Sequence, residues 1–161
     1  FNQEHHDDCH GIFWPIVSTP FLNPKQYEKF FAPYFNELIN LCVTNRVYTN
    51  VFFEGCWKPF YDQMQEMPDN DYIIGTLEIG DYKEFKDTLG RKIIPYGGLH
   101  CTTLGRGSLE NNINSVKKLI DDCAPGGRFI IGTDMYLLNK EDANPENLKA
   151  VINTIKEYGR Y

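Results

Sequence analysis

Residues that can do acid–base or metal chemistry gather at four points along this 161-residue chain, and each point follows a short apolar run. In chain order these points hold Glu54 with Cys56, Glu78, His100 with Cys101, and Thr133 with Asp134. Carboxylates and imidazoles transfer protons, and Cys, His and carboxylate groups ligate metal ions. Glu54 is the first candidate for catalysis, because a carboxylate directly after three apolar residues should be partly desolvated. Glu78 and Asp134 are assigned the same role.

Zinc is one possible occupant of such a site. His100, Cys101 and Cys56 would offer the nitrogen and sulfur ligands that zinc accepts. Adjacent residues on a regular strand point to opposite faces, so His100 and Cys101 could share a metal only if the backbone bends there. Gly97-Gly98 would permit such a bend. A metal-free pocket is the alternative.

Two further segments could bind charged ligands. Residues 5–10, with the sequence HHDDCH, could hold a divalent ion or could simply be a solvated segment. Arg106 stands just before a helix expected to begin after Ser108, where backbone N–H groups and the helix dipole favour an anion. The same residues could also form an ordinary turn. Trp57 and Thr133 join Arg106 as candidate substrate-binding or anion-binding residues.

Short apolar strands that alternate with amphipathic helices must position these groups. Strands are predicted at residues 50–53, 72–77, 92–96 and 129–131. Helix starts are predicted where a capping side chain precedes a proline or a capping-box partner, after Asn23, Asp81, Ser108 and Asn144. Strands separated by helices pair in parallel, so an α/β fold follows and an all-β fold is excluded. The carboxyl ends of parallel strands share an edge, which is where we expect the site.

The helix expected from Pro24 carries a long apolar stripe, and Pro33 should kink it. Its spacing predicts that one face packs on the sheet. The stripe consists of Tyr27, Phe30, Phe31, Tyr34, Phe35, Leu38, Ile39 and Cys42.

The chain is expected to hold one domain preceded by a loop. Residues 1–22 show no clear period and are assigned as an N-terminal loop segment, and residues 23–161 form the α/β domain. Closing a barrel takes about eight strands. Four parallel strands therefore make either an open sheet or half of a (β/α)8 barrel, whose uncovered edges would need a partner.

Composition excludes several kinds of partner. The net charge is −6 and the basic residues are scattered, which argues against nucleic-acid binding. No apolar run is long enough to span a membrane, and a cytoplasmic location is expected. The five cysteines are irregularly spaced and should be reduced, with Cys42 and Cys123 buried on helix faces.

Several stretches resemble uroporphyrinogen decarboxylase-like proteins, a superfamily that also contains corrinoid-dependent methyltransferases. They lie in the family's order at residues 23–30, 51–57, 123–134 and 144–159. The resemblance implies the last half of a (β/α)8 barrel. It also implies methyl transfer between a small donor and a corrinoid, with zinc as a possible second cofactor. Decarboxylation of a tetrapyrrole or other carboxylate is the alternative, and a non-catalytic subunit that completes a barrel is a third.

The resemblance has departures at residues that matter for chemistry. Phe52 and Glu54 stand where zinc-dependent methyltransferases carry a His-x-Cys motif. Thr133 and Asp134 stand where the decarboxylases carry a histidine after the last strand. The implied partners are an N-terminal half-barrel on another chain, a second copy of this chain, or the remainder of a longer polypeptide, together with a corrinoid protein.

Overall fold

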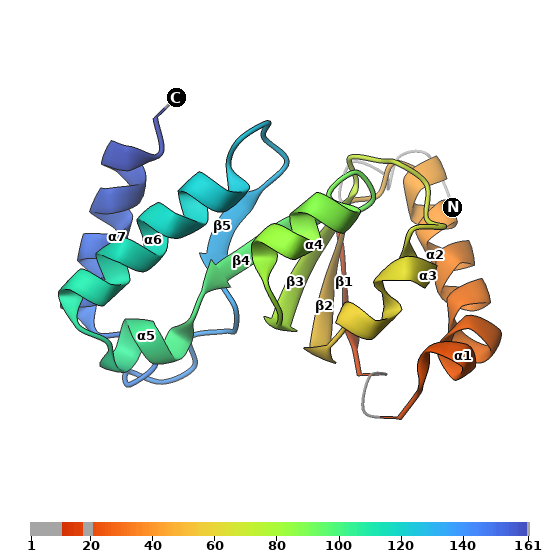
Figure 1. The fold of residues 1–161 in the computed structure, drawn as a ribbon, viewed down its shortest axis with the longest axis horizontal. Helices are drawn as coiled ribbons and strands as arrows, with labels where there is room; N and C mark the ends of the chain where they lie inside the picture. Colours follow the sequence, from red (N-terminus) through yellow and green to blue (C-terminus); the bar gives the residue numbers. More distant parts are fainter. Residues whose placement is uncertain (1–10, 18–20, 161) are drawn as a thin grey trace, which may run out of the picture. The chain divides into compact units, whose positions relative to one another are not determined.

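A computed structural model of the chain describes residues 11–17 and 21–160 (Figure 1). The possible metal-binding segment at residues 5–10 lies outside this part of the chain. The chain divides into two compact units, Phe1–Pro95 and Tyr96–Tyr161. The described strands pair in the order β1-β2-β3-β4-β5, and every pair is parallel. The predicted parallel α/β fold is therefore confirmed, with five strands in place of four.

The additional strand is β1 (Ile12–Ile16), which corrects the assignment of all of residues 1–22 to a loop. β1 pairs with β2 (Thr49–Cys56) from Ile12 opposite Thr49 to Ile16 opposite Phe53. Pro15 lies inside β1, and a proline argues against a strand when the sequence is considered alone. The prediction failed because pairing with β2, a distant segment, stabilises β1.

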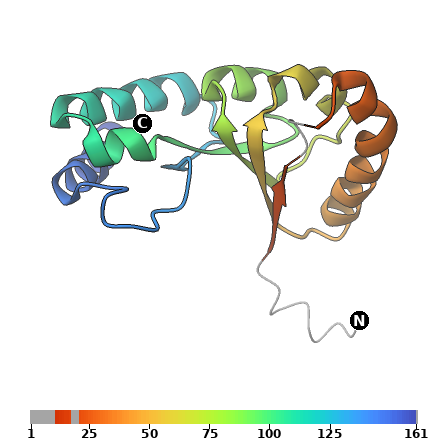
Figure 2. The same ribbon diagram turned by 90° about the horizontal axis from the view of Figure 1, so that it is seen from below.

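The first unit places β1, β2 and β3 (Ile73–Ile79) side by side, as both ribbon views show (Figures 1 and 2). Its helical segments are α1 (Pro24–Gln26), the π-helical turn η2 (Tyr27–Phe31), α2 (Ala32–Thr44), η3 (Lys58–Phe60), α3 (Tyr61–Met64) and α4 (Tyr82–Leu89). The first residues of β4 (Ile94–Leu99) pair with β3 in this unit.

The helix starts in this unit follow the predicted caps. Asn23 accepts a hydrogen bond from the Gln26 backbone N–H, and the Gln26 side chain accepts one from the Asn23 N–H, both at 3.0 Å. This is a capping box. The irregularity expected at Pro33 lies just ahead of it, in the π-helical turn η2. Pro33 has no N–H to donate, so regular α-helical bonding is interrupted near this point.

One face of β2 and β3 carries the core of the first unit. Val51, Phe53, Ile73 and Leu77 are fully buried on that face. The Phe53 ring contacts Trp57 and also Phe85 of α4. Alternation along the strands turns Phe52, Glu54 and Glu78 to the opposite face, where each is half-buried.

The second unit contains the rest of β4, α5 (Cys101–Arg106), α6 (Leu109–Cys123), β5 (Ile130–Thr133) and α7 (Pro145–Tyr158). Tyr96 to Leu99 of β4 pair in register with β5, and α6 and α7 lie side by side (Figure 2). The core consists of Leu99, Leu104, Val116, Ile120, Ala124 and Val151. The caps predicted at Ser108 and Asn144 are confirmed, as is the burial of Cys42 and Cys123.

Candidate functional site

The end of β2 is irregular, and this irregularity positions a carboxylate. Phe53 pairs with Leu77, but Cys56 pairs with Ile79, so the strand bulges between them. Gly55 adopts φ 78°, a left-handed conformation that glycine tolerates. Its N–H donates a hydrogen bond of 2.7 Å to Oε2 of Glu78. The bulge therefore brings together the predicted positions at the ends of β2 and β3.

Glu54 and Glu78 are neighbours in this arrangement. Each directly follows one member of the Phe53–Leu77 register pair, and Glu78 accepts its hydrogen bond from Gly55, the residue next to Glu54. Both residues are half-buried. The hydrogen bond thus links Glu78 to the bulge that contains Glu54, and a catalytic role for either residue stays a prediction.

Trp57 has a different environment from the one predicted. Its side chain is completely buried, and its Nε1–H donates a hydrogen bond of 2.9 Å to the backbone carbonyl of Glu54. Its ring contacts those of Tyr27, Phe53 and Phe60. This corrects the assignment of Trp57 to substrate binding, because a side chain with no exposed surface in the aromatic core serves packing.

The second unit brings together His100, Cys101 and Asp134. His100 Nδ1 lies 2.8 Å from Oδ2 of Asp134, and the Cys101 backbone N–H donates a hydrogen bond of 3.0 Å to Oδ1. Asp134 directly follows β5, and His100 directly follows the neighbouring strand β4. Parallel pairing thus delivers both residues to the same edge, as the sequence pattern predicts.

Two backbone features allow the adjacent residues His100 and Cys101 to bond to the same carboxylate, Asp134. Gly97 and Gly98 have φ values of 126° and 92°, so the backbone departs from regular strand geometry where a bend was predicted. His100 is then the N-cap of α5, and Cys101 is its first residue. Strand alternation therefore no longer applies, and adjacent residues reach the same carboxylate. The α5 helix was not predicted, because its six residues contain too few apolar positions for a periodic signal.

Contacts within this group shift the pKa values of His100 and Asp134. The hydrogen bond and negative charge of Asp134 raise the pKa of His100, although burial opposes the shift. Burial pushes the pKa of Asp134 upward, but hydrogen bonds from His100 and Cys101 outweigh it and leave that pKa below its usual value. An aspartate that bonds Nδ1 orients the ring, and the His100 side chain is 56% exposed. This is the geometry of an oriented general acid or base.

Cys101 does not have the character of a reactive thiolate. Burial, together with the hydrogen bond and negative charge of Asp134, raises the pKa of its thiol to about 11. The sulfur lies 3.5 Å from the carbonyl oxygen of Met135. At neutral pH the thiol is protonated, so Cys101 is unsuited to nucleophilic attack.

Two further candidate binding residues, Thr133 and Arg106, belong to the second unit. Thr133 ends β5, opposite Leu99, and is half-buried. Arg106 ends α5 and is exposed. The Ser108 side chain accepts a hydrogen bond from the Asn111 N–H, so this residue caps α6 as an ordinary turn into a helix would. Anion binding at Arg106 stays a prediction.

The described residues do not fit the zinc site that the sequence suggested. Within residues 11–17 and 21–160, no three His, Cys, Asp or Glu side chains come together as a metal-binding group. Cys56 is exposed and Cys101 is half-buried. His100 and Asp134 bond to each other instead.

The chain resembles a methyltransferase in structure. A solved methyltransferase from Methanosarcina mazei has a TM-score of 0.63 and 16% sequence identity, over 93% of this chain and 43% of that chain. At this identity the likeness shows the fold, and it confirms an α/β fold that forms part of a (β/α)8-type barrel. The present chain spans less than half the length of that methyltransferase.

Sequence comparison identifies the family. No protein with a curated description matches the chain by sequence. Among the described residues, no helix combines the length and apolar character that crossing a membrane requires. The sequence matches the family model of uroporphyrinogen decarboxylase (URO-D) over residues 7–158, which is nearly the whole chain. The chain therefore belongs to the uroporphyrinogen decarboxylase family.

Proposed function

We propose that this chain contributes a proton-transfer pair, His100 and Asp134, to an enzyme that moves a methyl group between a small donor and a corrinoid cofactor. The observation that carries the proposal is the 2.8 Å contact between His100 Nδ1 and Asp134 at the ends of adjacent parallel strands. The shared fold with a methyltransferase supports this reaction class.

The chemistry of demethylation explains the need for this pair. When a methyl group leaves an oxygen, nitrogen or sulfur atom, the electron pair of the broken bond stays on that atom, which then takes a proton. The corrinoid supplies the nucleophile that accepts the methyl group. Protonated His100 would donate the proton from Nε2, while Asp134 orients the ring and balances its charge. Since Asp134 raises the pKa of His100, the acid form persists to higher pH.

Decarboxylation of a tetrapyrrole or other carboxylate is the second candidate, and the family match favours it. Loss of carbon dioxide breaks a carbon–carbon bond and leaves its electron pair on carbon. The same His100 imidazolium could protonate that carbon, and Arg106 could hold a second carboxylate. Glu54 and Glu78 remain separate acid–base candidates in the first unit.

The test uses the complete enzyme, in which this chain is joined by the polypeptide that supplies the remaining strands and helices of the barrel. We expect His100→Gln to lower kcat for methyl transfer to cob(I)alamin by about 10²–10⁴-fold, the usual contribution of a general acid. Asp134→Asn should move the alkaline limb of the kcat profile to lower pH. Thr102→Ala, an exposed change on the same helix, should leave both unchanged.

Three outcomes separate the candidates. Methyl transfer with the expected pH profile supports the proposal. Release of carbon dioxide from a porphyrinogen, without methyl transfer, replaces it with the decarboxylase. Full activity of both variants at every pH removes His100 and Asp134 from the chemistry and favours a non-catalytic subunit.

A further inference from the structure

The η2–α2 segment carries more apolar surface than its own sheet covers. Phe35, Ile39 and Cys42 are buried against the core, as the stripe predicted. A second row remains exposed, at positions spaced by four, four and three residues. It consists of Phe30 (59% exposed), Tyr34 (68%), Leu38 (47%) and Leu41 (60%). This corrects the expectation of a single sheet-facing stripe.

Spacing of this kind is typical of a helix with a packing partner. Residues three and four apart lie on one face of a helix, so the exposed row forms a continuous ridge. A surface helix with one partner carries polar side chains on its other faces. The second apolar row therefore indicates a second contact surface on this helix.

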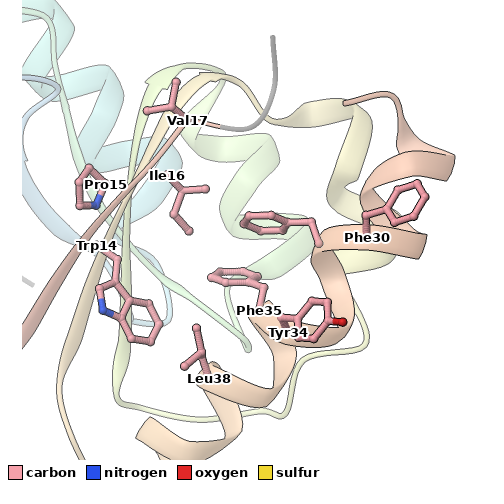
Figure 3. A pocket seen from close by; sticks show the side chains of 9 residues that line it. Trp14, Pro15, Ile16, Val17, Phe30, Tyr34, Phe35 and Leu38 are labelled. Carbon is pink, nitrogen blue, oxygen red and sulfur yellow. The ribbon is translucent and has the colours of Figure 1, made fainter. Parts of the chain in front are cut away.

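The exposed row forms one wall of a groove, and β1 forms the other. The groove has a volume of about 430 Å³, and its lining includes Trp14 and Ile16 from β1 and Phe30, Tyr34 and Leu38 from the helix. Figure 3 shows the side chains of the strand facing those of the helix across the hollow. A second hollow continues along α2 through Leu41 to Thr44. Together the two hollows follow the helical segment from Phe30 to Thr44.

We propose that this groove binds the apolar face of a helix from a further βα unit. Two observations favour such an occupant. A groove bounded by a strand and a helix is where the next helix of a parallel α/β layer packs, and β1 is first in the described strand order. In addition, more than half of the M. mazei methyltransferase lies outside the part that this chain matches.

Side-chain chemistry also favours this occupant. The groove is lined by apolar and aromatic residues, with the Tyr34 hydroxyl as a polar group, whereas Glu37 and Asn40 lie along the second hollow. An amphipathic helix has the matching pattern of an apolar ridge with polar margins. Residues 1–10, with the sequence FNQEHHDDCH, hold a single large apolar side chain and match it poorly.

Site-specific photocrosslinking of the complete protein tests this inference independently of the proposed chemistry. The photoreactive residue p-benzoylphenylalanine would replace Tyr34 in one sample and Asp87, an exposed α4 residue outside the groove, in a control. After irradiation, mass spectrometry identifies the crosslinked peptides. We expect Tyr34 to crosslink to a helix with apolar residues at three- and four-residue spacing, from a βα unit outside residues 11–160.

A charge placed in the groove provides the second arm. Leu38→Glu should lower the crosslinking yield at position 34 by about tenfold or more, because binding the helix would desolvate the new carboxylate. Leu41→Lys should act in the same direction. Asn153→Glu adds the same charge at an exposed position of α7 that lines neither hollow, and it should leave the yield unchanged.

Other crosslinks would overturn the inference. A crosslink from Tyr34 to α2 of a second copy would make the groove a self-association surface. A crosslink to residues 1–10 would mean that the chain covers its own groove. A yield at Tyr34 no higher than at Asp87 would indicate a solvated surface.

Discussion

His100 and Asp134 lie 34 positions apart in the chain and meet because β4 and β5 are parallel neighbours. The carboxylate bonds both the imidazole and the first N–H of α5, so it orients the ring and caps the helix. Removal of Asp134 should therefore change the pKa of His100 more directly than any other single substitution in this unit.

The pair predicts a defined pH window for its contribution to stability. Because the folded pKa of His100 is raised, its contribution is complete below about 6.5, the ordinary value, and is lost as pH rises through the folded pKa. The pKa of Asp134 is lowered, so its contribution is present above about 3.9 and is lost as pH falls through the folded pKa.

The contribution should therefore be largest between these two ordinary values. Asp134→Asn should lower the urea midpoint most within this window and should flatten the decline of the midpoint on either side of it. NMR titration should show a lower pKa for His100. An unchanged His100 titration in the variant would contradict the pairing.

The cysteines should differ in reactivity. The pKa of Cys101 is raised from 9.0 to about 11, which reduces its thiolate fraction roughly a hundredfold at neutral pH. Cys56 is exposed, whereas Cys42 and Cys123 are buried. Brief iodoacetamide treatment should label Cys56 well before Cys101, as read by peptide mass spectrometry, and Asp134→Asn should accelerate labelling of Cys101. Equal labelling of Cys56 and Cys101 would be evidence against the protonated thiol.

Trp57 should affect stability directly. Its side chain is completely buried among aromatic rings. Trp57→Ala should lower the free energy of unfolding by about 3–5 kcal/mol, since it leaves a large cavity. Phe21→Ala, at a position 74% exposed, should change it by less than about 0.5 kcal/mol. Urea denaturation measures both, and similar values for the two variants would argue against a core role.

At the level of elements, a buried asparagine ties α7 to α5 and the turn that follows it. Asn147 is 5% exposed, and its Nδ2 donates hydrogen bonds to the carbonyls of Leu104 (3.0 Å) and Gly107 (2.9 Å). Asn112 of α6 similarly donates to the carbonyls of Thr103 and Ser108. These bonds hold the short helix α5, and with it His100, against the longer helices.

Removal of the Asn147 side chain should lower the stability of the protein. Asn147→Ala removes both bonds. The Leu104 carbonyl still accepts a hydrogen bond from the Asn144 N–H, whereas the Gly107 carbonyl loses the Asn147 donor. The substitution should reduce the free energy of unfolding by about 1–3 kcal/mol. Asn153→Ala removes the same side chain from an exposed position of the same helix and should have little effect. Chemical denaturation monitored by circular dichroism distinguishes them, and a neutral Asn147→Ala would contradict the proposed tie.

At the level of the whole molecule, each unit has its own apolar core. Leu77 belongs to the first core and Leu104 to the second, and both are almost fully buried. Separate cores can open as separate cooperative units. Each unit should therefore respond most strongly to substitutions in its own core.

Hydrogen exchange tests this independence. Leu104→Ala, which should cost about 2–5 kcal/mol, is expected to speed amide exchange mainly in residues 96–160. Leu77→Ala should act mainly on residues 11–95. Equal acceleration in both units by either variant would show that the two cores unfold as one.

Much of the fold was predictable because its signals are local. The caps at Asn23, Asp81, Ser108 and Asn144 are each set by a few neighbouring residues, and all four are found. The strands that precede the candidate site residues were located in the same way. Family membership was also recognisable, since the resembling stretches run in order along most of the chain.

The sequence by itself therefore determined the alternation of strands and helices, the parallel pairing and the strand ends at which His100 and Asp134 stand. Only the tertiary structure decided that Ile12–Ile16 is a strand, that Trp57 is buried, and that Tyr34 and Leu38 are exposed while Phe35 and Ile39 are not. The physical reason is the range of the interactions. Caps and periodicity depend on neighbours in sequence, whereas pairing, burial and the imidazole–carboxylate contact depend on segments far apart in the chain.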